Sequence, residues 1–212
     1  MKTNRPFGFS AFLVVLAMAP PVFAYEYPLT LEAIREAYFL GSGQKSKNAD
    51  FYSQYSHSLG DAKADPPGSI NTIDTPYLQI AEHSRDTSNY HAQDAEKDFF
   101  QKPAEFHVFL NIYFKPVEAD DSNTGKSASD GADSKKGMRV KLMQHKKEIA
   151  CRTVESYPLY PFHNASTLAE HDGEYAEISC DAAKIDSSVL IVTVETPDSQ
   201  QVETEFDLAE IK

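Results

Sequence analysis

The sequence contains no tryptophan and only two cysteines among its 212 residues. Tryptophan is the largest of the aromatic side chains used in binding sites, so its absence argues against stacking on a sugar ring. The two cysteines, Cys151 and Cys180, are not in a C-x-x-C arrangement, and no histidine is adjacent to either. A thiol redox motif is therefore excluded. In an exported chain two cysteines most often pair, so we expect a Cys151–Cys180 disulfide that stabilises the fold by about 3.5 kcal/mol.

No hydrophobic run is long enough to cross a membrane, which takes about 20 residues. The longest one, residues 7–19, follows a short basic start and is followed by two prolines and then by Val22-Phe23-Ala24. This layout is typical of a secretory signal peptide. We expect cleavage after Ala24, a secreted or periplasmic location, and no transmembrane segment in the mature chain.

Basic residues are scarce. The chain has 20 Lys and Arg against 32 Asp and Glu, a formal net charge of −12. Removal of residues 1–24 takes away Lys2 and Arg5 and no acidic residue, so the mature chain carries −12 − 2 = −14. Such an acidic protein repels nucleic acid and anionic lipid. The expected partner is a protein or another component of the cell envelope.

The mature chain opens with helical signals. Thr30 is suited to cap a helix that stops at Gly41. Within this segment Leu31, Ile34 and Tyr38 are spaced to form one apolar stripe. A helix of this length is too short to be stable alone. We therefore expect the stripe to pack against the rest of the protein.

Three further helices are predicted before Pro103. Residues 46–59 carry aromatic side chains at four-residue spacing, and Thr75-Pro76 combines a capping residue with proline at the first helical position. The latter predicts a helix that continues to residue 84. Ser88 is a candidate cap for a helix over residues 89–101.

Beyond Pro103 the hydrophobic period changes from helical to alternating. Residues 105–114 (EFHVFLNIYF) are apolar on both faces, which predicts a central strand that is covered on both sides. Five more strands are expected, over residues 138–144, 148–154, 175–183, 189–195 and 202–208. Between the first two of these six strands, residues 117–137 are polar and charged and predict a mobile loop.

Together these patterns predict an α+β protein. Three to four short helices in residues 25–103 are followed by an antiparallel β-sandwich of about six strands in residues 104–212. Whether the two regions form one domain or two stays open at this point.

The segments TLEAIREAYFLGSG and VTVETPDSQQVETEFDLAEI resemble parts of an uncharacterised group of exported bacterial proteins that has no assigned function. The resemblance covers the two ends of the mature chain. It implies export, a helical start and a β finish, and it brings no catalytic residues with it.

Complete catalytic motifs are missing from the sequence. Gly125-Lys126-Ser127 matches only the end of a phosphate-binding loop, and Asp120 stands where that loop needs glycine. The aspartates of the same stretch offer oxygen ligands, so calcium is an alternative, but the bidentate glutamate of a calcium loop is missing. There is neither an H-E-x-x-H nor a G-x-S-x-G sequence.

One group of residues suits zinc. Imidazole nitrogens with nearby carboxylates are typical zinc ligands. They occur together at His163, His171, Asp172 and Glu174. A metal-dependent hydrolase built on this group is the alternative hypothesis for function, and no cofactor is predicted otherwise.

The segment from Tyr157 to His163 contains two prolines and three aromatic residues, Tyr157, Tyr160 and Phe162. Prolines favour an extended, exposed backbone, on which the rings would form a platform for a partner. The other interpretation is that the rings cover one end of the sandwich. The leading functional hypothesis is a non-enzymatic exported protein that serves as a binding or assembly module in the cell envelope.

Overall fold

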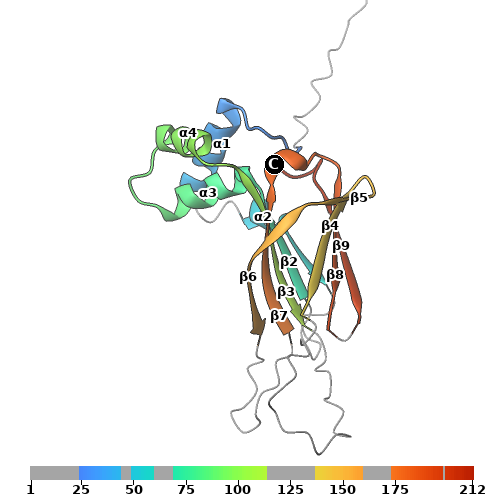
Figure 1. Ribbon diagram of the computed structural model, residues 1–212. Coiled ribbons are helices and arrows are strands. Elements are labelled where there is room, and N and C mark those ends of the chain that lie inside the picture. The colour runs from blue at the N-terminus through green and yellow to red at the C-terminus, as the bar shows by residue number, and fades with distance from the viewer. Residues whose placement is uncertain (1–23, 44–48, 60–68, 114–136, 160–172, 198) are drawn as a thin grey trace, which may run out of the picture.

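The computed structural model describes residues 24–43, 49–59, 69–113, 137–159, 173–197 and 199–212 (Figure 1). Four α-helices lie in these residues: α1 (Leu31–Ser42), α2 (Ala49–Ser53), α3 (Pro76–Asp86) and α4 (Ala92–Gln101). The nine described strands are β1 (Ser56–Leu59), β2 (Ser69–Asp74), β3 (Glu105–Tyr113), β4 (Arg139–Gln144), β5 (Lys147–Ile149), β6 (Cys151–Leu159), β7 (Gly173–Asp181), β8 (Val189–Glu195) and β9 (Gln201–Asp207). The fold is therefore α+β, as the sequence predicts.

The strands form two antiparallel sheets. The five-stranded sheet has the order β1-β2-β3-β7-β6, and the four-stranded sheet has the order β5-β4-β8-β9. In Figure 1 the two sheets lie side by side, with helices α1, α3 and α4 gathered at one end of the sandwich. No helix in the described parts of the chain is long and apolar enough to cross a membrane.

Strand β3 is central in its sheet, and its two faces differ. On the face toward the four-stranded sheet, the side chains are completely buried in the main core: Phe106, Val108, Leu110 and Ile112. Those on the other face, which we call the outer face, are only half-buried. The expectation that β3 is covered on both sides is thus met fully on one face and partly on the other.

Helices α1 and α3 begin where the capping residues predict. The hydroxyl oxygens of Thr30 and Thr75 each accept a hydrogen bond from a backbone N–H in the first turn, 3.2 Å away. Ile34 is fully buried against the other helices, whereas Leu31, predicted as part of the same stripe, is 48% exposed. Helix α4 starts later than expected, at Ala92, because the carboxylate of Asp94 accepts a bond from the backbone N–H of His91.

The predicted helix over residues 46–59 is wrong in its second half. Among the described residues of this stretch Ala49–Ser53 are helical, and Ser56–Leu59 form β1, which pairs with β2. Tyr55 lies between the two elements with its side chain fully buried. Its carbonyl accepts a bond from the Ile73 N–H. Pairing with a distant strand therefore outweighs the local helical spacing.

The predicted strand over residues 148–154 is split at Ala150 between the two sheets. β4 and β5 form a hairpin whose two turn residues, His145 and Lys146, both have positive φ angles (50° and 63°). After Ala150 the chain continues as β6 at the edge of the five-stranded sheet. The predicted Cys151–Cys180 disulfide is present, with a Cα–Cα distance of 4.4 Å, and it joins β6 to β7.

Candidate functional site

A polar cluster lies on the outer face, where β3, β7 and β6 are adjacent. His107 Nδ1 is 2.9 Å from Glu177 Oε1, and His107 Nε2 is 3.6 Å from Glu105 Oε2. Arg152 donates from Nη2 to both carboxylate oxygens of Glu105, at 2.8 and 2.9 Å, and the Ser179 hydroxyl donates to the same carboxylate at 2.6 Å. The bond from Ser179, followed by that from Arg152, lowers the pKa of Glu105. Glu105 is therefore ionised and well compensated.

This cluster holds a serine and a histidine, but not in a catalytic arrangement. A serine nucleophile needs its hydroxyl bonded to a general base. The Ser179 hydroxyl instead donates to Glu105, and its side chain is buried. The group around His107 thus links β3, β6 and β7 through ion pairs and hydrogen bonds, and it does not activate Ser179 as a nucleophile.

Asp74 of β2 lies opposite His107 of β3 in the sheet register. Its side chain is half-buried, and within the described residues its Oδ1 atom is buried without a hydrogen-bond partner. Burial, reinforced by the nearby Glu82 and Glu177 carboxylates, raises the pKa of Asp74 to about 8. The acid is therefore mostly protonated at neutral pH and holds a proton next to the cluster.

Further along the outer face the surface is aromatic. The rings of Tyr157 (β6) and Tyr175 (β7) stack with centroids 4.5 Å apart and an interplanar angle of 22°. Tyr157 is 44% exposed, and Ile70 of β2 is 43% exposed. The first residue of the predicted platform is thus an exposed, supported ring. Tyr160 and Phe162 lie outside the described residues, so the platform as a whole stays a prediction.

β6 forms one edge of the five-stranded sheet. Among the described strands it pairs with β7 alone, and every side chain from Arg152 to Pro158 is exposed. A register shift between Thr153 and Glu155 marks a bulge around Val154, which is itself exposed. The apolar side chains of Val154 and Tyr157 are thus exposed along this edge.

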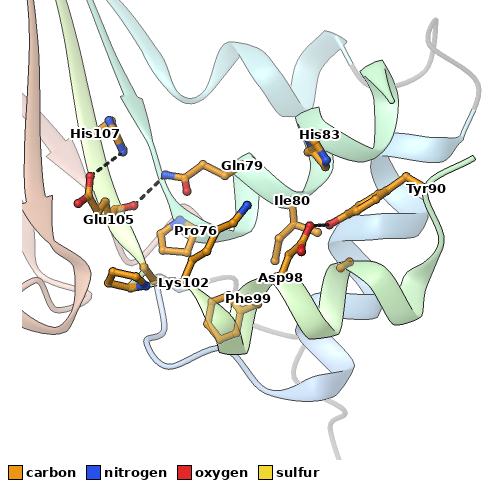
Figure 2. A pocket seen from close by; sticks show the side chains of 13 residues that line it. Pro76, Gln79, Ile80, His83, Tyr90, Asp98, Phe99, Lys102, Glu105 and His107 are labelled. Atoms are coloured by element: carbon orange, nitrogen blue, oxygen red, sulfur yellow. Dashed lines mark hydrogen bonds and ion pairs between the residues drawn. The ribbon is translucent and has the colours of Figure 1, made fainter. Parts of the chain in front are cut away.

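A pocket of about 330 Å³ lies between the helices and the start of β3 (Figure 2). Its wall is formed by α3, the segment before α4, α4 itself and the chain from Lys102 to His107. On one side of the pocket Gln79 connects α3 to the start of β3, because its amide donates to the Glu105 carbonyl oxygen at 2.8 Å. On the other side the Tyr90 hydroxyl donates to Asp98 Oδ2 over 3.4 Å.

The predicted zinc ligands cannot be assembled from the described residues. His163, His171 and Asp172 lie outside them, as does the stretch considered for calcium. The Glu174 carboxylate accepts bonds from the Met138 N–H and from the Ser156 hydroxyl. Within the described part of the chain, no three His, Cys, Asp or Glu residues are grouped so that they could hold a metal.

Sequence reasoning missed both the cluster at His107 and the pocket. Their residues come from segments separated by whole helices and strands, and no spacing rule relates them. The alternation of residues 105–114 places His107 on the face opposite the core, which is the one local signal that was present. Comparisons of the chain with protein-family models, with curated proteins and with solved structures found no match.

Proposed function

We propose that this chain is an exported, non-enzymatic binding protein of the cell envelope, and that β6 with the adjacent outer face contacts a protein or another envelope component. Two features support export: the basic and apolar layout of residues 1–24 and the Cys151–Cys180 disulfide. Disulfides persist in oxidising compartments such as the periplasm. Cleavage after Ala24 is part of this proposal.

The observation that carries the proposal is the exposed edge at β6. An extended partner segment can add to such an edge through backbone hydrogen bonds, while side-chain contacts give specificity. One edge strand of the other sheet, β9, presents alternating acidic residues, Glu203, Glu205 and Asp207, which oppose such pairing. β6 carries one acidic residue, Glu155, and exposes the apolar side chains of Val154 and Tyr157.

The proposal is tested by binding of the purified chain to envelope fractions. Wild type is expected to retain a defined envelope component that the Tyr157→Ala variant loses. The Glu203→Ala variant, altered on the exposed surface of β9, is the matched control and is expected to retain it. Equal retention by wild type and Tyr157→Ala would contradict the proposal.

The alternative, a metal-dependent hydrolase that uses His163, His171, Asp172 and Glu174, has less support. Glu174 already accepts two hydrogen bonds within the chain, which leaves less of its carboxylate for a metal. Metal analysis of the purified chain separates the two hypotheses. Stoichiometric zinc that is lost in a His171→Ala variant would favour the hydrolase.

A further inference from the structure

The pocket between the helices and β3 has features of a small-ligand site that is separate from the β6 edge. We call it the helix–strand pocket. Its apolar lining includes Ile80 from α3 and Phe99 from α4. Its volume of about 330 Å³ is at the lower end of the range of small-molecule sites, which is roughly 300–1,000 Å³. A ligand with a short hydrocarbon body fits this size and lining.

The two carboxylates that line this pocket are not equivalent. Glu105 is paired with Arg152 and bonded by Ser179, so its charge is already compensated. Asp98 is half-buried, and within the described residues its carboxylate accepts one long hydrogen bond, from Tyr90. A carboxylate has room for about four donors. Asp98 therefore retains acceptor capacity for a ligand.

Tyr90 is held in place beside Asp98 by its own contacts. Its backbone carbonyl accepts a bond from the Tyr38 hydroxyl at 3.1 Å, and its ring packs edge-on against the His83 ring with centroids 4.5 Å apart. Figure 2 shows Tyr90 and Asp98 directed toward each other at one end of the pocket. A fixed carboxylate next to an aromatic ring is the combination that recognises an organic cation.

Lys102 lines the same pocket; it directly follows α4, and its backbone N–H donates to the Asp98 carbonyl oxygen at 3.2 Å. An ammonium group at this spacing is able to reach the carboxylate. It therefore competes with a bound cation. Removing the Lys102 charge is expected to strengthen the binding of a cationic ligand.

We propose that the helix–strand pocket binds an alkylammonium group, with the ammonium on Asp98 and the hydrocarbon chain along Ile80 and Phe99. The proposal is independent of the β6 edge. Either a free diamine or the side chain of a lysine residue has this chemistry, and the experiment distinguishes the two sources.

Isothermal titration calorimetry of the purified chain tests the proposal with three probes: 1,5-diaminopentane, Nα-acetyl-lysine amide and the neutral 1,5-pentanediol. We expect an amine to bind and the diol not to bind. Asp98→Asn is expected to weaken the amine at least about tenfold, because a hydrogen bond to a charged group is lost. Glu203→Gln removes one negative charge from the exposed surface of β9 and should leave the affinity unchanged within about twofold.

Lys102→Met provides a second variant that leaves Asp98 intact, and it is expected to raise the amine affinity. Tighter binding of the acetyl-lysine amide would identify a lysine side chain as the source, and tighter binding of the diamine would identify a free amine. The proposal is overturned if the diol binds as well as the diamine, or if neither amine binds at millimolar concentration. It is equally overturned if Asp98→Asn and Glu203→Gln weaken binding alike.

Discussion

Tyr157 stacks on Tyr175 across the β6–β7 pair, with ring centroids 4.5 Å apart. Tyr157 lies on the edge strand β6 and is 44% exposed. Tyr175 lies on β7, between β3 and β6, and is half-buried. Tyr157 therefore buries a smaller share of its surface than Tyr175. The stack thus leaves the Tyr157 ring exposed while the Tyr175 ring supports it.

Replacing Tyr157 with alanine is therefore expected to destabilise the fold only slightly, by about 1 kcal/mol, the size of one aromatic pair. Tyr175→Ala should cost more, because that residue is less exposed. Chemical denaturation of both variants measures the difference. Unfolding of Tyr157→Ala under native conditions would show that the ring belongs to the core and does not serve partner binding.

Removing the disulfide is expected to destabilise the chain substantially. Cys151 and Cys180 are 29 residues apart, and the loss of a cross-link over such a loop costs about 3.5 kcal/mol in the chain-entropy model. A Cys151→Ala, Cys180→Ala double variant compared with wild type by denaturant unfolding checks this value. Amide exchange in β6 should also accelerate, since the edge strand loses its covalent tie to β7. An unchanged unfolding midpoint would contradict this account.

Asp74 is expected to make stability depend on pH. Its pKa is about 8 in the folded chain against an ordinary value of 3.8, so the folded state holds an extra proton between these values. Stability then falls as pH rises from about 4 to 8 and levels off above that range. Asp74→Asn cannot ionise and removes this contribution.

Unfolding at pH 5 and pH 8 measures the effect of the Asp74 substitution. The free energy of unfolding of Asp74→Asn, measured relative to that of wild type, should be higher at pH 8 than at pH 5 by more than about 1 kcal/mol. Glu203→Gln, on the exposed surface of β9, is the control. A difference between Asp74→Asn and wild type that is the same at both pH values would show that Asp74 is not held protonated.

Gly41 allows α1 to approach α3 closely. A Cβ atom at this position would lie 1.8 Å from the Ala81 carbonyl oxygen, which belongs to the backbone and cannot move aside. Alanine is more favourable than glycine in a helix by about 1 kcal/mol, but the clash outweighs this gain, so the substitution lowers the free energy of unfolding. Gly41→Ala is expected to destabilise by about 1–3 kcal/mol, the usual cost of overpacking.

Gly43 is the matched control for this substitution. Its added Cβ would meet the nearest atom, the Phe39 carbonyl oxygen, at 3.2 Å, and its φ of −70° suits any residue. Gly43→Ala should change the free energy of unfolding by no more than about 0.5 kcal/mol. Equal effects of the two substitutions would contradict the close α1–α3 packing.

The parts of the fold that the sequence predicts depend on neighbouring residues. Thr30 and Thr75-Pro76 mark helix starts through bonds within one turn, and the alternation in residues 105–114 identifies the central strand. The sequence does not predict β2, because a polar residue of this strand points into the core and interrupts the apolar alternation. Asn71 is fully buried, and its amide donates to the Thr204 hydroxyl of the other sheet. Such a pair is formed only once both sheets are in place.

The candidate sites were less predictable for the same reason. The prolines and aromatic residues of segment 157–163 point to Tyr157 as a surface residue. Its exposure agrees with a role in binding but does not test that role. Asp98 shares the helix–strand pocket with Glu105 because α4 ends and β3 begins between them. Nothing in that short segment indicates how the helix and the strand are oriented.

Site-specific photo-crosslinking in cells tests the binding surface most directly. A photoreactive phenylalanine derivative replaces Val154 on β6 in one protein and Glu203 on β9 in another. The account predicts a discrete adduct from position 154 that disappears when Tyr157→Ala is added, and no such adduct from position 203. Adducts of equal yield at both positions, or an adduct at position 154 that is unaffected by Tyr157→Ala, would contradict it.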